Sequence, residues 1–152
     1  MSTPTESTAD ATSPETEIRK QLTEWCAALY DQDMDRMMKL YSPDILLFDM
    51  RPPFRIQGAD AYRKQWEDCF PYMPGKIGTD LREVKILVSG DMAFATCFNR
   101  LSDGVSGKPI GNTWVRATLC FQRMDGVWKV VHEHASVPVH PESSEVAWIT
   151  EL

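Results

Sequence analysis

An Asp-Gly pair between two long alternating segments is the feature that most restricts how this chain can fold. Asp125-Gly126 separates residues 114–123 from residues 127–139. Asp-Gly is a preferred pair for a two-residue β-turn, in which both central residues take positive φ. If the turn contains these two residues alone, Phe121 faces Val130, Leu119 faces His132, and Ala117 faces His134. The sequence therefore predicts a β-hairpin with a defined register.

This register predicts which side chains point into the protein, because side chains alternate between the two faces of a strand. One face is apolar except for two histidines, whereas the other is mixed. The apolar face is expected to point inward, which directs His132 and His134 into the interior. The outward face would suit a sheet-to-sheet contact between two copies of the chain, and it carries Arg116, Thr118, Lys129, Val131, Glu133 and Ala135.

Three helices are predicted before the hairpin. Ser13 can cap a helix that has Pro14 at its first position and ends near Asp31. Asp33 can cap a second, short helix that extends through Tyr41. A third helix follows Gly58, and its expected buried stripe contains Tyr62, Trp66, Cys69 and Phe70.

The remaining segments read as strands. Residues 45–50 form a compact apolar run between the second and third helices, and residues 84–88 and 92–101 precede the hairpin. Helices grouped against a meander of long strands predict an α+β domain. Long strands covered by few helices must curve, so we expect a curved antiparallel sheet that encloses a pocket. Residues 1–12 are expected to be a disordered tail, residues 13–139 the domain, and residues 140–152 a C-terminal extension.

Composition excludes several classes of partner. The formal charge of −6 and the pI near 5.0 argue against nucleic acid and anionic membranes, which need a basic surface. No apolar run approaches the ~20 residues of a membrane span, so a cytoplasmic protein is expected. The expected pocket would hold a small organic ligand. The cysteines are scattered, without the spacing of a zinc site, and we expect neither a metal nor a cofactor.

The closing segment Asp125-Gly126-Val127-Trp128-Lys129-Val130-Val131-His132-Glu133-His134-Ala135-Ser136 carries a family resemblance. The first half contributes Asp31-x-Asp33, Leu40-Tyr41-Ser42-Pro43-Asp44, Phe48-Asp49 and Gly58. Over residues 15–139 the chain resembles the NTF2-like superfamily, and within it the SnoaL-like and ketosteroid-isomerase-like proteins. The closing segment is also similar to the association domain of calcium/calmodulin-dependent kinases. The resemblance implies an NTF2-like cone of three helices on a curved sheet, a scaffold that hosts many reactions.

The resemblance to the isomerases implies part of a catalytic site. Their proton-shuttling aspartate at the end of the first strand matches Asp49. Their helix 1 tyrosine, a donor in the oxyanion hole, is replaced by Trp25, and the protonated acid of their third long strand by Ala117. With two expected donors missing, standard steroid isomerisation is not expected. In the kinase association domain, one pocket arginine matches Arg100 and a second falls on Leu119.

The residues themselves leave several roles open. Asp49 would favour its neutral form in an apolar hollow, as a general acid or base requires, or it would hydrogen-bond the following loop. His132 and His134 would act as acid/base groups, as hydrogen-bond donors to a ligand or as two ligands of a metal, or they would be an interior pair with hydrogen bonds satisfied inside the protein. Arg100 would bind a ligand carboxylate if it faces inward, and otherwise it would reach solvent or pair with an acid. The aromatic residues on the expected core faces would line the pocket: Trp25, Tyr62, Trp66, Phe94 and Phe98.

Two functions therefore compete. The first is an enzyme of the isomerase or lyase type, which transfers a proton or catalyses elimination on a small cyclic substrate with Asp49 as base. The second is a non-catalytic domain that binds small carboxylates through Arg100 or assembles with other chains. A dimeric protein with a filled core is the third, plainer reading.

Overall fold

The computed structural model describes residues 13–152, and the tail predicted for residues 1–12 lies outside the described residues. The α+β class is confirmed. Helices α1 (Pro14–Tyr30), α2 (Met34–Met38) and α3 (Ala59–Cys69) accompany the short 3₁₀ turn η1 (Phe70–Tyr72). The six strands are β1 (Tyr41–Phe48), β2 (Ile56–Gln57), β3 (Ile77–Ser89), β4 (Met92–Asp103), β5 (Val115–Met124) and β6 (Val127–Ser136).

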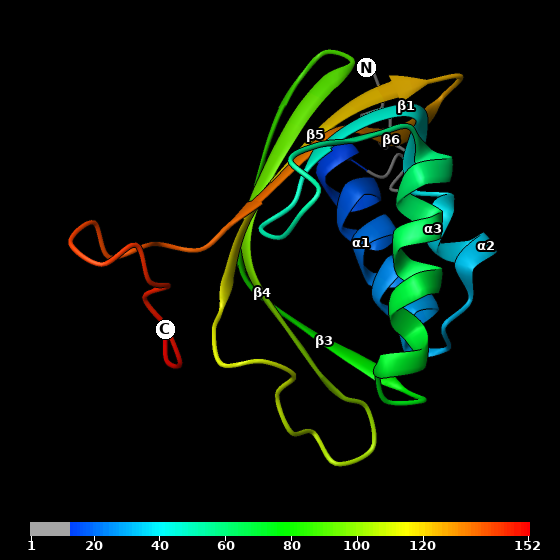
Figure 1. Cartoon of the computed structure of the whole chain (residues 1–152). Helices are drawn as coiled ribbons and strands as arrows, with labels where there is room; N and C mark the ends of the chain where they lie inside the picture. Colours follow the sequence, from blue (N-terminus) through cyan, green and yellow to red (C-terminus); the bar gives the residue numbers. More distant parts are fainter. Residues whose placement is uncertain (1–12) are drawn as a thin grey trace, which may run out of the picture.

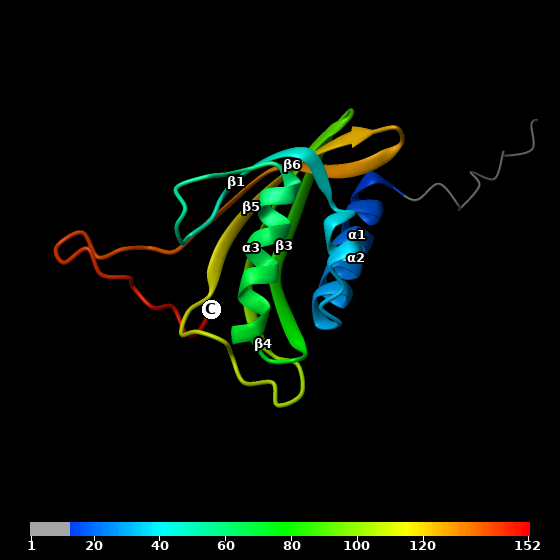
Figure 2. The ribbon, with the colours of Figure 1, turned by 45° about the vertical axis from the view of Figure 1, so that its right-hand side comes forward.

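The six strands form one curved sheet in the order β2-β1-β6-β5-β4-β3. Figures 1 and 2 show the helices gathered on the concave side of this sheet. The prediction of a purely antiparallel sheet is wrong, because β1 and β6 pair in parallel. These two strands are far apart in sequence, and nothing in either segment indicates the direction in which they meet. None of the described helices is long and apolar enough to cross a membrane.

The predicted starts of α1 and α2 are confirmed. The Ser13 hydroxyl accepts the backbone N–H of Thr16 at 3.2 Å, and Asp33 accepts that of Arg36 at the same distance. The second helix is nevertheless shorter than predicted, because Tyr41 begins β1 and pairs with Val130. This pairing also buries Tyr41, a stronger constraint than its helical spacing.

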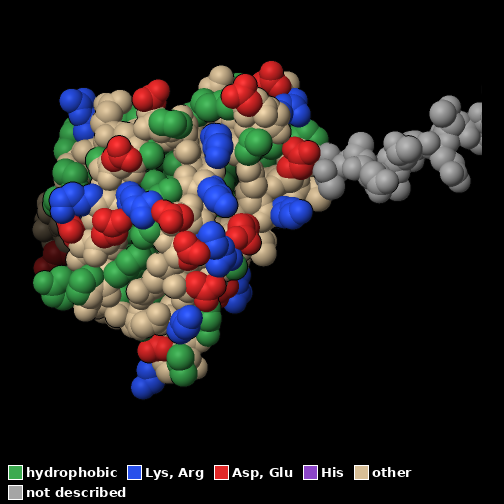
Figure 3. Space-filling view, turned by 90° about the vertical axis from the view of Figure 1, so that its right-hand side faces the viewer, with side chains coloured by type: hydrophobic (Ala, Val, Ile, Leu, Met, Phe, Trp, Pro, Cys, Tyr) green, Lys and Arg blue, Asp and Glu red, His purple; other side chains and the backbone are tan. Residues whose placement is uncertain are grey.

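The core lies between the helices and the concave face of the sheet. Ile18 of α1 packs in one cluster with Leu47 of β1, Phe121 of β5 and Trp128 of β6, and all four are almost fully buried. The solvent side of α2 and α3 is polar instead, and Figure 3 shows charged side chains of both signs side by side on this face. Arg63 of α3 contributes there by pairing with Asp35 of α2 at 2.7 Å.

The hairpin turn forms as predicted, but its register holds only near the turn. Asp125 and Gly126 both have positive φ, 50° and 78°, and Phe121 faces Val130. The register then shifts between Cys120 and Phe121. Val131 is the additional residue of a β-bulge, which is left without a partner on the opposite strand.

The bulge moves every later residue of β6 by one position. Cys120 faces His132, Leu119 faces Glu133, and Thr118 faces His134. Because Leu119 is buried on the concave face, Glu133 points inward and the two histidines point outward. The predicted inward placement of His132 and His134 is therefore wrong, as is the outward placement of Glu133.

The C-terminal segment returns to the body of the protein beside Trp114. The backbone N–H of Trp114 donates to the carbonyl of Ile149 at 2.7 Å, and the N–H of Ile149 donates to the Thr113 hydroxyl at 3.0 Å. Trp148, by contrast, stays 58% exposed. The return of this segment thus involves Ile149 and not the adjacent tryptophan.

Candidate functional site

A carboxyl group and a phenol meet on the concave side of the sheet. Glu133 lies on β6, between Leu119 of β5 and Leu47 of β1. The hydroxyl of Tyr62, on α3, lies 3.5 Å from Glu133 Oε2 at the outer limit of hydrogen bonding. Tyr62 is itself buried, so the contact is held in place by packing around the ring.

The surroundings of Glu133 change its protonation. The pKa of Glu133 is raised from 4.5 to about 7: burial is the largest cause, the nearby charge of Asp49 acts in the same direction, and the Tyr62 hydrogen bond opposes both. A carboxyl group with this pKa is protonated in a large fraction of the molecules at neutral pH. Glu133 can therefore either donate or accept a proton under physiological conditions.

Asp49 supplies a second carboxyl group directly after β1. Its Oδ1 accepts the backbone N–H of Met50 at 2.7 Å, and its Oδ2 accepts the side-chain amide of Gln65 at 2.9 Å. The Arg51 guanidinium lies 3.8 Å from Oδ2. The side chain remains 23% exposed, so Asp49 is both oriented and accessible, as a base that acts on a bound molecule must be.

Aromatic rings surround this pair of acids. Tyr41 and Tyr62 pack edge to face with ring centroids 5.1 Å apart, and Trp25 and Trp66 do so at 6.0 Å. Burial raises the pKa of both tyrosines well above 10, which keeps them neutral donors. Together with the buried Leu119, the predicted residues Trp25, Tyr62 and Trp66 do lie in the core between helices and sheet. Their role in binding a ligand remains a prediction.

The histidines form a separate group on the convex face. The rings of His132 and His134 lie 4.9 and 5.4 Å from that of Phe48, which is the partner of His134 on β1. Nδ1 of His132 lies 2.6 Å from the carbonyl oxygen of Leu46. The bulge at Val131 thus separates both imidazoles from Asp49 by the thickness of the sheet.

Arg100 and Phe98 also differ from their predicted placement. Ala93, Ala95 and Cys97 of β4 are buried on the concave side, so the alternate residues from Phe94 to Arg100 point the other way. Arg100 lies opposite Asp80, and its guanidinium carbon is 4.4 Å from the Trp114 ring centroid. Arg100 and Phe98 therefore do not line the concave side. Phe94, on the same face of β4, is 44% exposed.

The sequence interpretation missed three members of the cluster, each for a different reason. Glu133 was assigned to the outer face because valine pairs such as Val130-Val131 do not mark a bulge. Tyr41 was placed in a helix, and Gln65 lies next to the predicted stripe of α3 but outside it. No pattern of residue types identifies the bulge. For Tyr41 a signal existed, because the apolar run that follows it is compatible with a strand that begins before residue 45.

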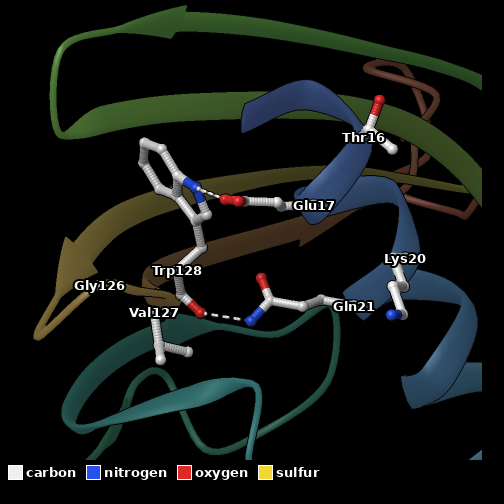
Figure 4. A pocket seen from close by; sticks show the side chains of 7 residues that line it. All are labelled: Thr16, Glu17, Lys20, Gln21, Gly126, Val127 and Trp128. Carbon is white, nitrogen blue, oxygen red and sulfur yellow. Dashed lines mark hydrogen bonds between the residues drawn. The ribbon is translucent and has the colours of Figure 1, made fainter. Parts of the chain in front are cut away.

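A hollow of about 240 Å³ lies elsewhere, between α1 and the turn of the hairpin (Figure 4). There the Trp128 indole donates to Glu17 at 3.0 Å, and the Gln21 amide donates to the Trp128 carbonyl at 2.8 Å. These bonds attach α1 to β6, which is a structural role. A second hollow lies at the C-terminal segment, beside His140 and Trp148. Within residues 13–152, no three His, Cys, Asp or Glu residues are grouped to hold a metal ion.

Comparison with known proteins identifies the family. The model of the SnoaL-like domain matches residues 18–140, and the chain therefore belongs to the SnoaL-like family. A search of curated proteins gave no significant match.

Solved structures support the same fold. An NTF2-like protein of unknown function from Pseudomonas putida KT2440 is 30% identical, with a TM-score of 0.78, over 88% of this chain and 93% of its own. A candidate dehydratase of the NTF2-like family from Streptomyces avermitilis is 23% identical (TM-score 0.68; 84% and 99% covered). A candidate calcium/calmodulin-dependent protein kinase type II association domain from Thiobacillus denitrificans is 21% identical (TM-score 0.63; 84% and 96% covered).

Proposed function

We propose that this SnoaL-like protein is an enzyme of the isomerase or lyase type, which binds a small cyclic substrate in a pocket on the concave side. Asp49 acts as the base, and Glu133 acts as the acid. The observation that carries the proposal is the buried carboxyl group of Glu133. It has a pKa of about 7 and lies near a second, accessible carboxylate, that of Asp49. Two acids with different environments are the usual arrangement for proton transfer near neutral pH.

The proposed reaction begins with removal of a proton from a carbon next to a carbonyl group. Asp49 takes this proton, and the electron pair moves onto the carbonyl oxygen to form an enolate. Glu133 in its protonated form donates a hydrogen bond to that oxygen or to a leaving hydroxyl group. The reaction ends when Asp49 returns the proton to another carbon, or when the hydroxyl group departs as water with the proton of Glu133.

Glu133 takes the place of the acid that appeared to be missing. The resemblance to the isomerases pointed to Ala117, which is apolar, but Glu133 reaches the same concave side from the adjacent strand. The name given to the Streptomyces avermitilis neighbour also supports this reaction class, since a dehydratase catalyses elimination of water.

The carboxylate-binding alternative loses its main support. It depended on Arg100, which stacks on Trp114 at the convex face. The concave cluster instead contains Asp49 and Glu133, and the negative charge of the Asp49 carboxylate repels an anionic ligand. An uncharged substrate is therefore favoured over a small carboxylate.

Hydrogen exchange at carbon tests the proposal without knowledge of the natural substrate. β-Tetralone, cyclohexanone and cyclohexenone are incubated with the protein in deuterium oxide, and loss of the protons next to the carbonyl is followed by NMR. We expect faster exchange of at least one ketone with the protein than in buffer. Asp49→Asn should lower this gain at least about a hundredfold, whereas the exposed Asp44→Asn should not. Failure of all three ketones to exchange faster, or an unchanged rate in Asp49→Asn, contradicts the proposal.

We further propose that the convex face binds a second copy of the chain. Cross-strand neighbours form one largely apolar ridge over five strands: Leu87, Phe94, Cys120, His132 and Leu46. At about 4.8 Å per strand it is about 19 Å long. Leu87 is 62% exposed. Because Cys120 is the middle residue, a twofold axis above it lays the ridge of one copy on the same ridge of the other.

A further inference from the structure

We infer that the convex face carries a zinc site, which Cys120 and His132 of two copies of the chain form together. Each copy supplies one thiolate and one imidazole, so the ion has four ligands of the kind that zinc prefers. This inference rests on the proposed dimer. It is independent of the proposed reaction, because both acids of the candidate site lie on the concave side.

One thiol and one imidazole are direct neighbours on the convex face. Cys120 of β5 faces His132 of β6 in the register that follows the bulge. Cys120 lies between Leu119 and Phe121, which are buried on the concave side, so its thiol points outward. Opposed side chains of this kind have Cβ atoms about 5 Å apart, and a sulfur and a nitrogen bound to one zinc ion lie about 3.5 Å apart. The two side chains can therefore bind the same ion.

The imidazole of His132 is oriented as a metal ligand needs to be. Its Nδ1 lies 2.6 Å from the carbonyl oxygen of Leu46, which can only accept, so Nδ1 carries the hydrogen and donates it. The lone pair of the neutral ring is then on Nε2, which no residue in the described range 13–152 engages. Histidines that bind metals nearly always donate their other N–H in this way, because the bond fixes the tautomer and the direction of the ring.

One copy of the chain offers only half of a site. A structural zinc ion has four ligands, and the part of the chain that the structure describes contains no group of three. The proposed twofold axis passes above Cys120, so it brings the Cys120 side chains of the two copies together. His132, the next residue of the ridge, lies close to the same axis. An ion on the axis thus meets two thiolates and two imidazoles.

The surroundings favour zinc over a hard cation. Neither the ridge of Cys120 nor the adjacent row of cross-strand neighbours, from Lys85 to Phe48, contains a carboxylate. Magnesium and calcium require oxygen ligands, whereas thiolate and imidazole suit zinc. Each thiol releases its proton to solvent when the ion binds, and two thiolates neutralise one Zn²⁺. A neutral site is compatible with the largely apolar ridge around it.

The chain contains a matched control for each ligand. His134 lies on the same face two residues further along β6, and its ring centroid is 6.4 Å from that of His132. It faces Thr118 instead of a cysteine, so it lies farther from the proposed axis. Cys69, at the end of α3, is a half-buried free thiol like Cys120.

Cobalt(II) tests the site as a spectroscopic substitute for zinc. Thiolate–cobalt bonds absorb in the near ultraviolet, and tetrahedral geometry gives intense visible bands. Reduced, metal-free protein is titrated with Co²⁺, and we expect both sets of bands to saturate at one ion per two chains. Cys120→Ser and His132→Gln should each weaken binding at least about a hundredfold, since loss of a mere outer partner already costs about tenfold to a hundredfold. Cys69→Ser and His134→Gln should stay within about threefold of the wild type.

Two measurements on the wild-type protein locate the ion without a variant. Zinc should slow alkylation of Cys120 by iodoacetamide at least about tenfold, because a bound thiolate is a weaker nucleophile. Mass spectrometry should show no such protection at Cys69. Sedimentation velocity should show a larger fraction of dimer with zinc than with EDTA. A variant that does not fold therefore leaves the test intact.

The outcomes separate the zinc site from the proposals it stands beside. A metal-free dimer that gives no thiolate–cobalt band overturns the zinc site and leaves the dimer in place. A chain that stays monomeric with and without zinc overturns both. Binding that Cys120→Ser and His132→Gln leave unchanged indicates an adventitious ion only and also overturns the inference. Ketone exchange is measured in metal-free protein, so its result concerns the proposed reaction alone.

Discussion

The hydroxyl of Tyr62 lies 3.5 Å from the carboxyl group of Glu133, and this contact connects α3 with β6 across the concave side of the sheet. It gives a buried acid one polar neighbour, which offsets little of its burial. Glu133 consequently has a pKa of about 7. The acid lies between an aromatic interior and Asp49 at the rim, where both its protonated and its ionised form are accessible.

Stability should depend on pH through Glu133. Its pKa is about 7 in the folded state against an ordinary value of 4.5. Between these values the folded chain binds the proton and the unfolded chain releases it. The free energy of unfolding should therefore fall as pH rises from about 4.5 to 7, by up to about 3 kcal/mol. Urea unfolding of the wild type and Glu133→Gln measures this, and the variant should lose the slope. The exposed Glu151→Gln serves as control, and identical slopes in all three proteins contradict the assignment.

The same titration should appear in catalysis. If protonated Glu133 stabilises the enolate, ketone exchange should decline as pH rises through about 7. Glu133→Gln should retain activity within about tenfold, since an amide still donates a hydrogen bond, and it should not show this decline. Exchange rates between pH 5 and 9 decide the point. A decline that persists in the variant assigns it to another group.

Changes on the convex face should leave catalysis intact. His134→Gln and Arg100→Gln alter side chains that the bulge and the alternation of β4 turn away from Asp49. We expect ketone exchange within about twofold of the wild type for both. A loss of tenfold or more in a folded variant would show that these side chains act on the interior after all.

A cysteine cross-link should report the proposed dimer. If the ridges meet with Cys120 at their centre, mild oxidation should give a covalent dimer that Cys120→Ser abolishes and Cys69→Ser does not. Phe94→Asp should yield a monomer in light scattering, because it places a charge on the ridge. A wild-type protein that is monomeric at high micromolar concentration contradicts the proposal.

Local chemistry made much of the fold predictable. Ser13 and Asp33 cap their helices as expected, and Asp125-Gly126 forms the expected turn, because each depends only on a few neighbouring residues. The parallel pairing of β1 with β6 was not predictable, since it depends on how the whole chain closes.

The candidate site was predictable only for residues whose position does not depend on the register of the β5–β6 hairpin. Asp49, Trp25 and Trp66 follow from an apolar strand end and two helical stripes. Glu133 depends on the register beyond Val131, where the extra residue is an ordinary valine. A bulge costs little wherever the strand can bend, so β-branched residues on either side give no sign of it.

The number of residues between two positions on β6, more than the residue types there, decides which side chain reaches the interior. Glu133 occupies its place because it stands three residues after Val130, the last inward residue before the bulge. Removing His132 would advance the strand by one step and present His134 there instead, an imidazole in exchange for an acid. A deletion of one codon would thus change the proton-transfer group while the surrounding aromatic walls stay in place.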